Sequence, residues 1–361
     1  MADRDRLQGV RDRIDAVDSE ILRLISERGR LAQEVARIKR AAGEQEDFYR
    51  PEREQQVLRR LQQLNQGPLS EETVTRLFRE VMSACLALQQ PLRVGFLGPE
   101  GTFTQAAALK QFGHDVHLQP LNSIDTVFKE VESGDIHYGV VPVENSTEGV
   151  VNHTLDCFLN SPLQIVGEVE LRIQHHLVSR HGTRAEIQRV YSHPQGLAQC
   201  RTWLDVNLPA AERITVSSTA EAARLAASEQ GAAAIASEAA ADMYGLNRLA
   251  ESIEDQTGNT TRFLVIGRQS PPPTGDDKTS LVVSRIDQPG GLVKLLQPLS
   301  KHRINMTRLD ARPSRQGVWD YAFFIDLLGH AEDGNVQEAL QAMREQSSLF
   351  RILGSYPRVA R

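Results

Sequence analysis

The sequence predicts a multidomain protein with an all-α segment, an α/β segment and a small α+β segment, in that order. Three observations predict this order. A long apolar pattern of helical period covers residues 5–40, and from Leu92 short strand-like runs alternate with helical patterns. A proline- and glycine-rich linker at residues 269–278 then precedes a pattern of strands and helices in βαββαβ order.

The first segment begins with an apolar seam whose spacing alternates between three and four residues, as in a heptad repeat. Its members are Leu7, Val10, Ile14, Val17, Ile21, Leu24, Leu31, Val35 and Ile38. Shorter helices are expected near residues 51–65 and 71–90, separated by Gly43 and the Gly67-Pro68 pair. Because three helices of such unequal length cannot bury their apolar stripes in a monomer, we expect an intertwined dimer.

Basic and polar residues interrupt these apolar stripes. Arg28 occupies a seam position, Lys39 follows eleven residues later on nearly the same face, and Gln89 continues an apolar stripe of the third helix. Such a set, with Arg53 and Glu54 in the second helix, predicts a pocket for a small dianion. Arg11 lies about 25 Å before Arg28 along the helix, so it would reach the same pocket only from another protomer. The alternative is that these basic residues flank a coiled coil and extend into solvent.

In the α/β segment, four polar inserts interrupt strand-like runs: residues 98–104 (GPEGTFT), 142–147 (PVENST), 192–195 (SHPQ) and 259–263 (NTTRF). Loops at the carboxyl ends of strands in such a sheet converge on one crevice, where ligands bind. Helix N-termini and hydroxyl groups there suit an anion. Each insert alone could be an ordinary turn or cap. Together, with Glu144, His193 and Arg262 among them, they favour a binding site.

The last segment predicts a ferredoxin-like arrangement. A strand over residues 280–286 is followed by a helix that Pro289, Gly290 and Gly291 open and that ends near His302. Strands near 305–312 and 318–327, a helix near 333–346 and a strand near 350–356 complete the pattern.

Composition excludes several classes of protein. The net charge of −6 argues against a nucleic-acid partner, and no apolar run approaches the ~20 residues of a membrane span. Three distant cysteines without metal-ligand spacing, and a first segment unlike a secretory signal, favour a cytoplasmic location. Gly95, Gly98 and Gly101 are spaced GxxGxxG rather than GxGxxG, which argues against a nicotinamide enzyme.

The order of these segments and motifs resembles the family of bifunctional chorismate mutase/prephenate dehydratases of phenylalanine biosynthesis. The inserts at residues 98–104, 142–146, 192–195 and 261–263 carry the resemblance most specifically. It implies a chorismate mutase domain (1–91), a two-lobed dehydratase domain like periplasmic binding proteins (92–268), a linker (269–278) and an ACT regulatory domain (279–361). It implies chorismate, prephenate and phenylalanine as ligands, no cofactor or metal, and at least a homodimer.

The resemblance also assigns residues. In the mutase, Lys39 and Gln89 approach the ether oxygen of chorismate, while Arg11, Arg28 and Arg53 hold carboxylates and Glu54 binds the substrate hydroxyl. In the dehydratase, Thr261 is the family's candidate near the leaving hydroxyl, with Glu144 or His193 as the proton reservoir. Arg262 is either a carboxylate clamp or a structural ion pair. The remaining matched positions are expected to bind substrate: Asn145, Ser146, Ser192 and Gln195.

For regulation, the resemblance implies a phenylalanine site at Gly290, Gly291, Leu292 and Asp310. The family's Gly-Ala-Leu and Glu-Ser-Arg-Pro stretches read Gly-Gly-Leu and Asp-Ala-Arg-Pro here. A non-catalytic small-molecule sensor with an ACT module is the alternative function. A mutase-like helical pocket argues against it, because a sensor needs no such dimer.

Overall fold

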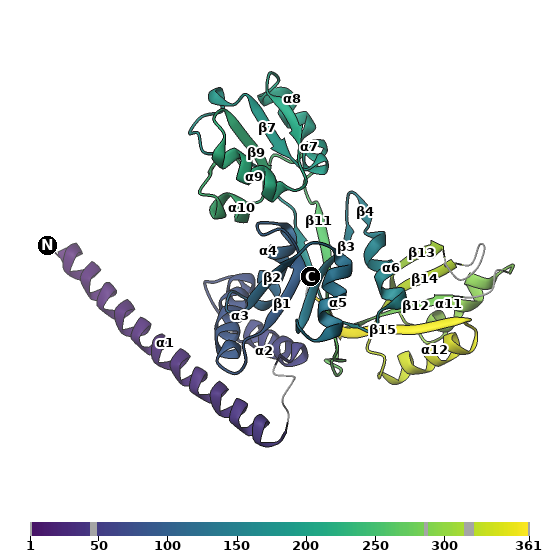
Figure 1. Ribbon diagram of the computed structural model, residues 1–361. Coiled ribbons are helices and arrows are strands. Elements are labelled where there is room, and N and C mark those ends of the chain that lie inside the picture. Colours follow the sequence, from purple (N-terminus) through teal and green to yellow (C-terminus); the bar gives the residue numbers. More distant parts are fainter. Residues whose placement is uncertain (1, 44–48, 285–287, 314–320, 360–361) are drawn as a thin grey trace. The chain divides into compact units, whose positions relative to one another are not determined.

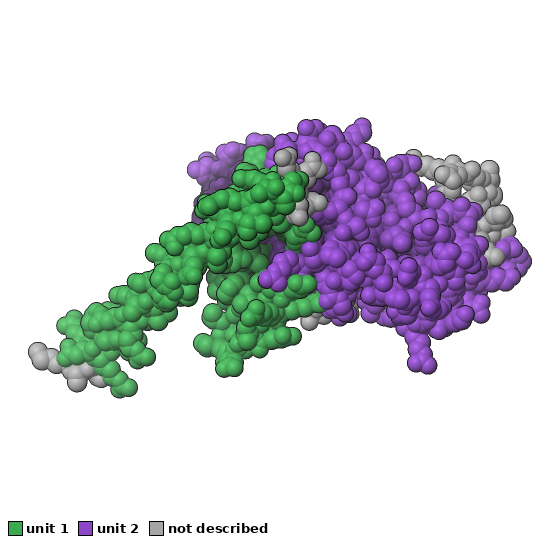
Figure 2. All heavy atoms as spheres, turned by 90° about the horizontal axis from the view of Figure 1, so that it is seen from below, with its two compact units in different colours: residues 1–50, 56–92, 112–117 green, residues 51–55, 93–111, 118–361 purple. Residues whose placement is uncertain are grey.

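The structure is a computed structural model, which describes residues 2–43, 49–284, 288–313 and 321–359. Contacts divide the chain into two compact units, shown in different colours in Figure 2. The first comprises residues 1–50, 56–92 and 112–117, and the second comprises residues 51–55, 93–111 and 118–361.

The first unit is built mainly from three helices, as the sequence predicted: α1 (Ala2–Ala41), α2 (Pro51–Leu64) and α3 (Glu71–Ala87). Pro51 opens α2 at a position that needs no backbone donor, and the Ser70 side chain caps α3 by accepting from Thr73 N. Helix α1 packs against α3 near Gly29, where an added Cβ would lie 3.3 Å from Leu88 Cδ1. The apolar seam of α1 is largely exposed: Leu7, Ile14, Val17, Leu31 and Ile38 are each at least half exposed.

The second unit contains three sheets (Figure 1). The first has the order β2-β1-β3-β11-β5, with β4 on β3. Its elements are β1 (Arg93–Leu97), α4 (Phe103–Phe112), β2 (His117–Leu121), α5 (Ile124–Ser133), β3 (Tyr138–Asn145), β4 (Gly149–Val150), α6 (Asn152–Asn160), β5 (Gln164–Arg172) and β11 (Thr260–Gly267). Strand β11 returns from the second sheet and pairs antiparallel with both β3 and β5.

The second sheet has the order β10-β6-β9-β7-β8. Its elements are β6 (His176–Ser179), a 3₁₀ turn (Arg184–Glu186), β7 (Arg189–Ser192), α7 (Pro194–Gln199), α8 (Arg201–Asn207), β8 (Glu212–Thr215), α9 (Thr219–Ser228), β9 (Ala232–Ala236), α10 (Glu238–Met243) and β10 (Asn247–Ala250). Strand β9 consists of alanines and one isoleucine, all buried, so helix α9 can approach the sheet closely.

The third sheet has the order β13-β14-β12-β15 and confirms the predicted ferredoxin-like arrangement. Its elements are β12 (Asp277–Ser284), α11 (Gly291–Lys301), β13 (Met306–Pro313), β14 (Tyr321–Leu328), α12 (Gly334–Glu345) and β15 (Leu349–Pro357). Strand β12 begins inside the predicted linker. Residues 285–286 and 318–320 of the predicted strands lie outside the described part of the chain.

The inner strands of the third sheet, β12 and β14, bury most of both faces, whereas the edge strand β13 is exposed at alternate residues. On one face Leu281, Val283 and Ile325 pack with residues of α11 and α12. On the other, Val282, Phe324 and Tyr356 join the core of the first sheet. The contact is closest at Gly354, because an added Cβ would lie 2.1 Å from Ile165 O.

In the described part of the chain, no helix is both long enough and apolar enough to span a membrane.

Candidate functional site

Two strands of the first sheet place Thr261 beside Asn145. Thr261 near the start of β11 pairs with Asn145 at the end of β3. The Asn145 amide donates to Thr261 Oγ1 at 2.7 Å and to Asn259 Oδ1 at 2.9 Å. Its oxygen accepts from the backbone N–H groups of Thr147 and Glu148, both at 3.0 Å. Asn145 therefore has its amide orientation fixed from both ends and holds the Thr261 hydroxyl in place.

The Thr261 hydroxyl is oriented as a donor. Thr261 is 8% exposed, and its hydroxyl oxygen already accepts a hydrogen bond from the Asn145 amide. Among the described residues, none accepts the Thr261 hydroxyl proton. The site therefore presents an O–H group with its hydrogen available to a bound molecule.

His175, from the segment between β5 and β6, and Gln199, at the end of α7, extend the hydrogen bonds of Asn145 and Asn259. His175 Nε2 lies 2.7 Å from Gln199 Oε1, and Asn259 Nδ2 donates to the same oxygen at 3.4 Å. Burial lowers the pKa of His175, which favours the neutral imidazole. With Nε2 as the donor to Gln199, the second ring nitrogen, Nδ1, is buried without a hydrogen-bond partner among the described residues. We call these five residues, Asn145, His175, Gln199, Asn259 and Thr261, the Thr261 group.

Sequence reasoning placed Asn145 and Thr261 in the site but did not assign Asn259, Gln199 or His175. Asn259 lay within a recognised insert and could have been found there. Gln199 ends α7, and His175 lies between β5 and β6, so neither belongs to a motif. Only the fold brings them to Asn259.

Some side chains of the SHPQ insert form hydrogen bonds within the fold, whereas others remain available to a ligand. Ser192 is fully buried and donates to Ile235 O at 3.0 Å, so its hydroxyl is used inside the second sheet. His193 caps α7, accepting from Gln195 N at 3.4 Å. The Gln195 side chain is partly exposed and has no hydrogen-bond partner among the described residues. Ser146 Oγ accepts from Thr260 N at 3.0 Å and so supports the start of β11. Of these four, Gln195 is the best placed to bind a ligand.

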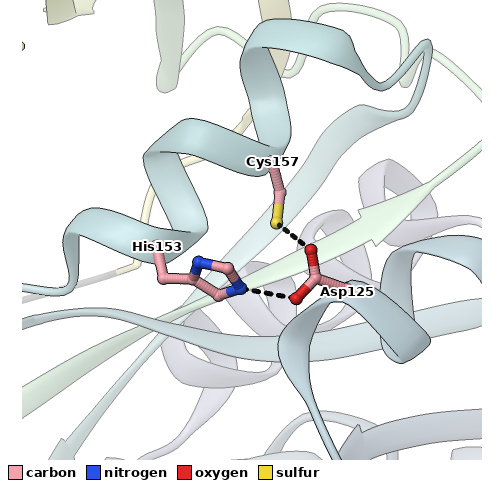
Figure 3. A group of neighbouring side chains, drawn as sticks. All are labelled: Asp125, His153 and Cys157. Atoms are coloured by element: carbon pink, nitrogen blue, oxygen red, sulfur yellow. Dashed lines mark hydrogen bonds and ion pairs between the residues drawn. The ribbon is translucent and has the colours of Figure 1, made fainter. Parts of the chain in front are cut away.

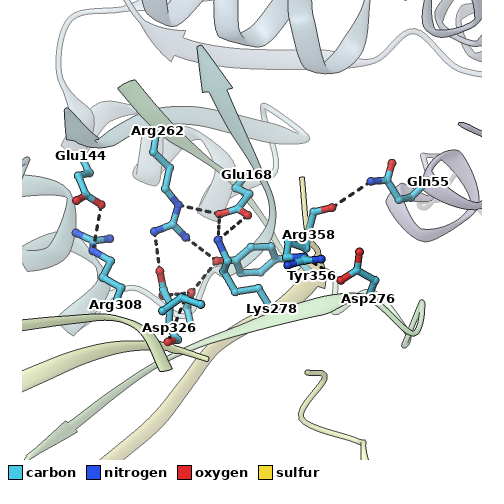
Figure 4. A network of polar contacts seen from close by, with 12 residues as sticks. Gln55, Glu144, Glu168, Arg262, Asp276, Lys278, Arg308, Asp326, Tyr356 and Arg358 are labelled. Atoms are coloured by element: carbon cyan, nitrogen blue, oxygen red, sulfur yellow. Dashed lines mark hydrogen bonds and ion pairs between the residues drawn. The ribbon is translucent and has the colours of Figure 1, made fainter. Parts of the chain in front are cut away.

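Arg262 was considered either as a carboxylate clamp or as part of a structural ion pair, and its contacts are those of an ion pair. It neighbours Thr261 on β11, so its side chain projects to the opposite face of the strand. There its Nε donates to Glu168 at 2.7 Å and its Nη1 to Asp326 at 2.6 Å (Figure 4). The position of Arg262 therefore does not support a clamp on the substrate in the Thr261 group.

A buried set of polar residues surrounds Arg262 between the first and third sheets. Lys278 Nζ lies 2.7 Å from Glu168, and the Tyr356 hydroxyl accepts from Arg262 at 3.0 Å. Burial alone would raise the pKa of Asp326, but Arg262 and Arg308 hold it below its usual value. We call Glu168, Arg262, Lys278, Asp326 and Tyr356 the Arg262 network. It joins strand β11, which carries Thr261, to the third sheet.

Glu144 lies on the same face as Arg262, since the two residues pair directly across β3 and β11. Arg308 Nε on β13 lies 3.4 Å from a Glu144 oxygen (Figure 4). The same nitrogen lies 2.5 Å from Asp310 Oδ2. Because Glu144 faces away from Thr261, its position does not support the role of proton reservoir there. Arg308 instead connects Glu144 to the residue that was predicted to bind the effector.

The predicted effector residues do not all contact one another. Gly290 adopts the left-handed conformation (φ 74°) that a glycine tolerates, and α11 begins directly after it. Asp310 pairs with Phe324, which faces the first sheet. In the described residues, no hydrogen bond or ion pair joins Asp310 to Gly290, Gly291 or Leu292.

The predicted mutase residues lie on helices α1 and α2, except Gln89, which lies in the turn after α3 because that helix ends at Ala87 and not near residue 90 as predicted. Arg28 is partly buried and donates to Val81 O of α3 at 3.3 Å, while Arg11 is exposed. Lys39 is half-buried near the end of α1, and the neighbouring Arg40 donates to Gln89 O at 2.5 Å. Arg53 and Glu54 belong to the second compact unit.

Comparison with protein families matches all three segments. Residues 10–90 match chorismate mutase type II, residues 94–271 match prephenate dehydratase, and residues 279–345 match the ACT domain.

Curated relatives cover nearly the whole chain. A bifunctional chorismate mutase/prephenate dehydratase of Stutzerimonas stutzeri is 55% identical, with 99% of each chain covered. One of the same name from Aquifex aeolicus is 45% identical, with 98% of each chain covered. Among solved structures, a prephenate dehydratase from Arthrobacter aurescens in complex with L-Phe is 37% identical. It has a TM-score of 0.69 and covers 74% of this chain and 90% of its own.

Proposed function

The chain belongs to the family of bifunctional chorismate mutase/prephenate dehydratases, and from this premise we propose how its residues divide the two reactions. The first activity is that of an isomerase, which rearranges chorismate to prephenate. The second is that of a lyase, which converts prephenate to phenylpyruvate. The full-length enzymatic relatives favour this reading over a non-catalytic sensor.

Dehydration of prephenate takes place at the Thr261 group. Loss of carbon dioxide supplies the electron pair that aromatises the ring and expels the ring hydroxyl. Hydroxide is a poor leaving group, so that oxygen must receive a proton or a strong hydrogen bond as its bond to carbon breaks. The observation that carries the assignment is the Thr261 hydroxyl, held by Asn145 with its own proton available.

Other residues complete this proposed site. His193 and Gln195 on the second sheet's side provide polar groups for the substrate carboxylates, and Ser146 supports the loop beside Asn145. His193 remains the candidate that would resupply a proton. Since Glu144 and Arg262 face the third sheet, we leave them out of the catalytic set.

The test is a comparison of Thr261→Ala, Thr261→Ser and Asn145→Ala. Loss of the Thr261 hydroxyl should lower kcat for prephenate by about 10²–10³, as removal of a transition-state donor does in other enzymes. Thr261→Ser should retain most of the rate because a hydroxyl remains, and Asn145→Ala should fall between the two because the hydroxyl loses its orientation. Phenylpyruvate formation from added prephenate is measured. Equal rates for Ala and Ser at position 261 would assign Thr261 a structural role.

The matched control for that test is Lys39→Ala, which should lose conversion of chorismate and keep that of prephenate. The mutase reaction is a pericyclic rearrangement, so the protein only selects the reactive conformer and stabilises charge on the breaking ether. We assign this to Lys39 and Gln89, with Arg11, Arg28 and Arg53 on the carboxylates and Glu54 on the hydroxyl. The exposed α1 seam supports a homodimer in which Arg11 comes from the partner.

Feedback control belongs to the third sheet and its helices. We assign phenylalanine binding to Gly290, Gly291, Leu292 and Asp310. Asp310 is ion-paired with Arg308, so an effector ammonium would compete with that guanidinium for the carboxylate. Released Arg308 would then pair more fully with Glu144, which is adjacent to Asn145 of the Thr261 group. Such inhibition requires phenylalanine to bind the two arrangements with different affinities.

Asp310→Asn tests this assignment, since it removes the charge and keeps the shape. Phenylalanine should inhibit dehydration of prephenate at least about tenfold more weakly, a loss of about 1.4 kcal/mol of binding, while the uninhibited rate stays near normal. Glu332→Ala, at an exposed acidic position in the same domain, should respond to phenylalanine like the wild type. Unchanged inhibition in Asp310→Asn would exclude Asp310 from the effector site.

A further inference from the structure

Helices α5 and α6 bring together three side chains that neither reaction uses. Asp125 lies in the first turn of α5, and His153 and Cys157 lie four residues apart on one face of α6 (Figure 3). One ligand atom from each of the three residues lies within 4.8 Å of the other two. Among the described residues, no other group of three or more histidine, cysteine and acidic side chains brings its ligand atoms this close together.

We propose that Asp125, His153 and Cys157 bind a divalent transition-metal ion of the zinc type. An imidazole nitrogen, a thiolate sulfur and a carboxylate oxygen are the three ligand types that zinc accepts. A tetrahedral ion with bonds of about 2.0–2.3 Å needs ligand atoms roughly 3.3–3.6 Å apart. His153 Nε2 lies 2.6 Å from Asp125 Oδ2, and Cys157 Sγ lies 3.7 Å from Asp125 Oδ1. Small side-chain rotations therefore suffice to admit the ion.

The two helices hold the ligands in place. Phe128 of α5 and Phe158 of α6 meet edge to face, with ring centroids 5.0 Å apart. Glu132 near the end of α5 accepts from the Ser161 hydroxyl just after α6. The Ser123 side chain caps α5 and fixes the turn that carries Asp125. These contacts fix α5 and α6 relative to each other, so the three ligand side chains are already close together before an ion binds.

The charge around the sulfur suits a cation. Burial raises the pKa of the Cys157 thiol to about 12, and the carboxylates of Asp125, Asp156 and Glu132 add to this effect. The same negative potential that disfavours a bare thiolate favours a divalent ion, which stabilises the thiolate by coordination. His153 and Asp125 are both about half exposed, so water can complete the coordination.

The ligands escape a search for cysteine motifs because only one of them is cysteine. His153 and Cys157 form an H-x₃-C pair on a single helix, and the third ligand comes from a helix more than 25 residues earlier. The site depends on the packing of α5 against α6, which no local spacing encodes.

Titration of the full-length, metal-stripped protein tests the proposal. Zn²⁺ is added in competition with a chromophoric chelator, and Co²⁺ serves as the spectroscopic probe. We expect one tightly bound equivalent of Zn²⁺ and a thiolate-to-cobalt charge-transfer band. Cys157→Ser should abolish that band. His153→Gln should keep the band while weakening Zn²⁺ binding by more than the roughly 10–100-fold that loss of an outer partner costs.

The matched control is His114→Gln. His114 is an exposed histidine paired with a carboxylate, Glu80 at 2.9 Å, and no cysteine belongs to that pair. This variant should bind Zn²⁺ and Co²⁺ like the wild type. Cys85 and Cys200 are buried, so neither should give the cobalt band.

A second measurement is independent of the spectrum. Zn²⁺ should raise the Tm of the wild type, because the ion binds only the folded arrangement of α5 and α6. His153→Gln should lose most of that rise, and its retained prephenate dehydration would show that it is folded. Equal Zn²⁺ affinity in the wild type and Cys157→Ser, or a cobalt band that survives in Cys157→Ser, would overturn the proposal.

Discussion

At the residue scale, burial of His175 controls the protonation of one member of the Thr261 group. Burial lowers its pKa, and its hydrogen bond to Gln199 only partly opposes this effect. The folded protein therefore resists a proton that the unfolded chain takes up near pH 6.5. As the pH falls through about 6.5, the unfolded state binds more protons, so the free energy of unfolding decreases. Above that range both states are neutral at this residue and its contribution is constant.

We therefore predict that His175→Gln flattens the pH dependence of stability. Denaturant unfolding between about pH 5.5 and 7.5 should show a wild-type slope to which His175 contributes at most about 1.4 kcal/mol per pH unit. The variant should lose that contribution, and its free energy of unfolding should vary less over the same range. An unchanged slope would assign the dependence to other titrating groups.

At the scale of elements, the contact between β15 and β5 joins the third sheet to the first. Gly354 makes it possible, since an added Cβ would lie 2.1 Å from Ile165 O and 2.8 Å from Ile165 N. These are backbone atoms, so they can move aside only if the strands separate.

Gly354→Ala should therefore lower the free energy of unfolding by about 1–3 kcal/mol, the usual cost of overpacking, or more if the sheets part. Gly334→Ala in α12 is the matched control, because an added Cβ there meets nothing within 4 Å. Chemical denaturation measures both variants. If the two were equally stable, the strands would not be held at this distance in solution.

The order of helices and strands could be predicted from the sequence because each has its own periodic pattern of apolar residues. The helical period of α1 and the βαββαβ order are local signals, and the structure confirms the helix and the sheet that they predict. Contacts between sheets carry no such signal. Arg262 follows Thr261 in one insert, and only the alternation of side chains along β11 shows that the two residues serve opposite faces.

The same limit applies to the site. Thr261 and Asn145 belong to motifs and could be predicted, whereas His175 and Gln199 come from unrelated segments that the fold brings together. Lys278, Asp326 and Tyr356 lie in the regulatory segment, so their pairing with Arg262 and Glu168 requires knowledge of how the sheets pack. Because these charges are buried, removing one partner would leave another uncompensated, which typically costs about 3–5 kcal/mol. The network thus makes the third sheet part of the folded dehydratase.

At the scale of the whole molecule, the exposed seam of α1 favours the proposed homodimer. Val17 is 57% exposed and Ile38 is 63% exposed, although both occupy apolar seam positions. A symmetric dimer would bury this seam and bring Arg11 of one protomer toward Arg28 of the other. Each mutase site would then need one arginine from each chain.

Mixing of two inactive variants tests that arrangement. Arg11→Ala and Arg28→Ala should each lose nearly all conversion of chorismate to prephenate, while their dehydratase activity serves as the internal control. After subunit exchange, half of the dimers are hybrids, and each hybrid has one site with both arginines and one with neither. The equimolar mixture should therefore recover up to about a quarter of the wild-type mutase rate. Recovery must follow the measured extent of exchange, since only hybrids carry an intact site. Complete exchange without recovery would place Arg11 and Arg28 in the same chain's site, and the long helix would then need another reason for its exposed seam.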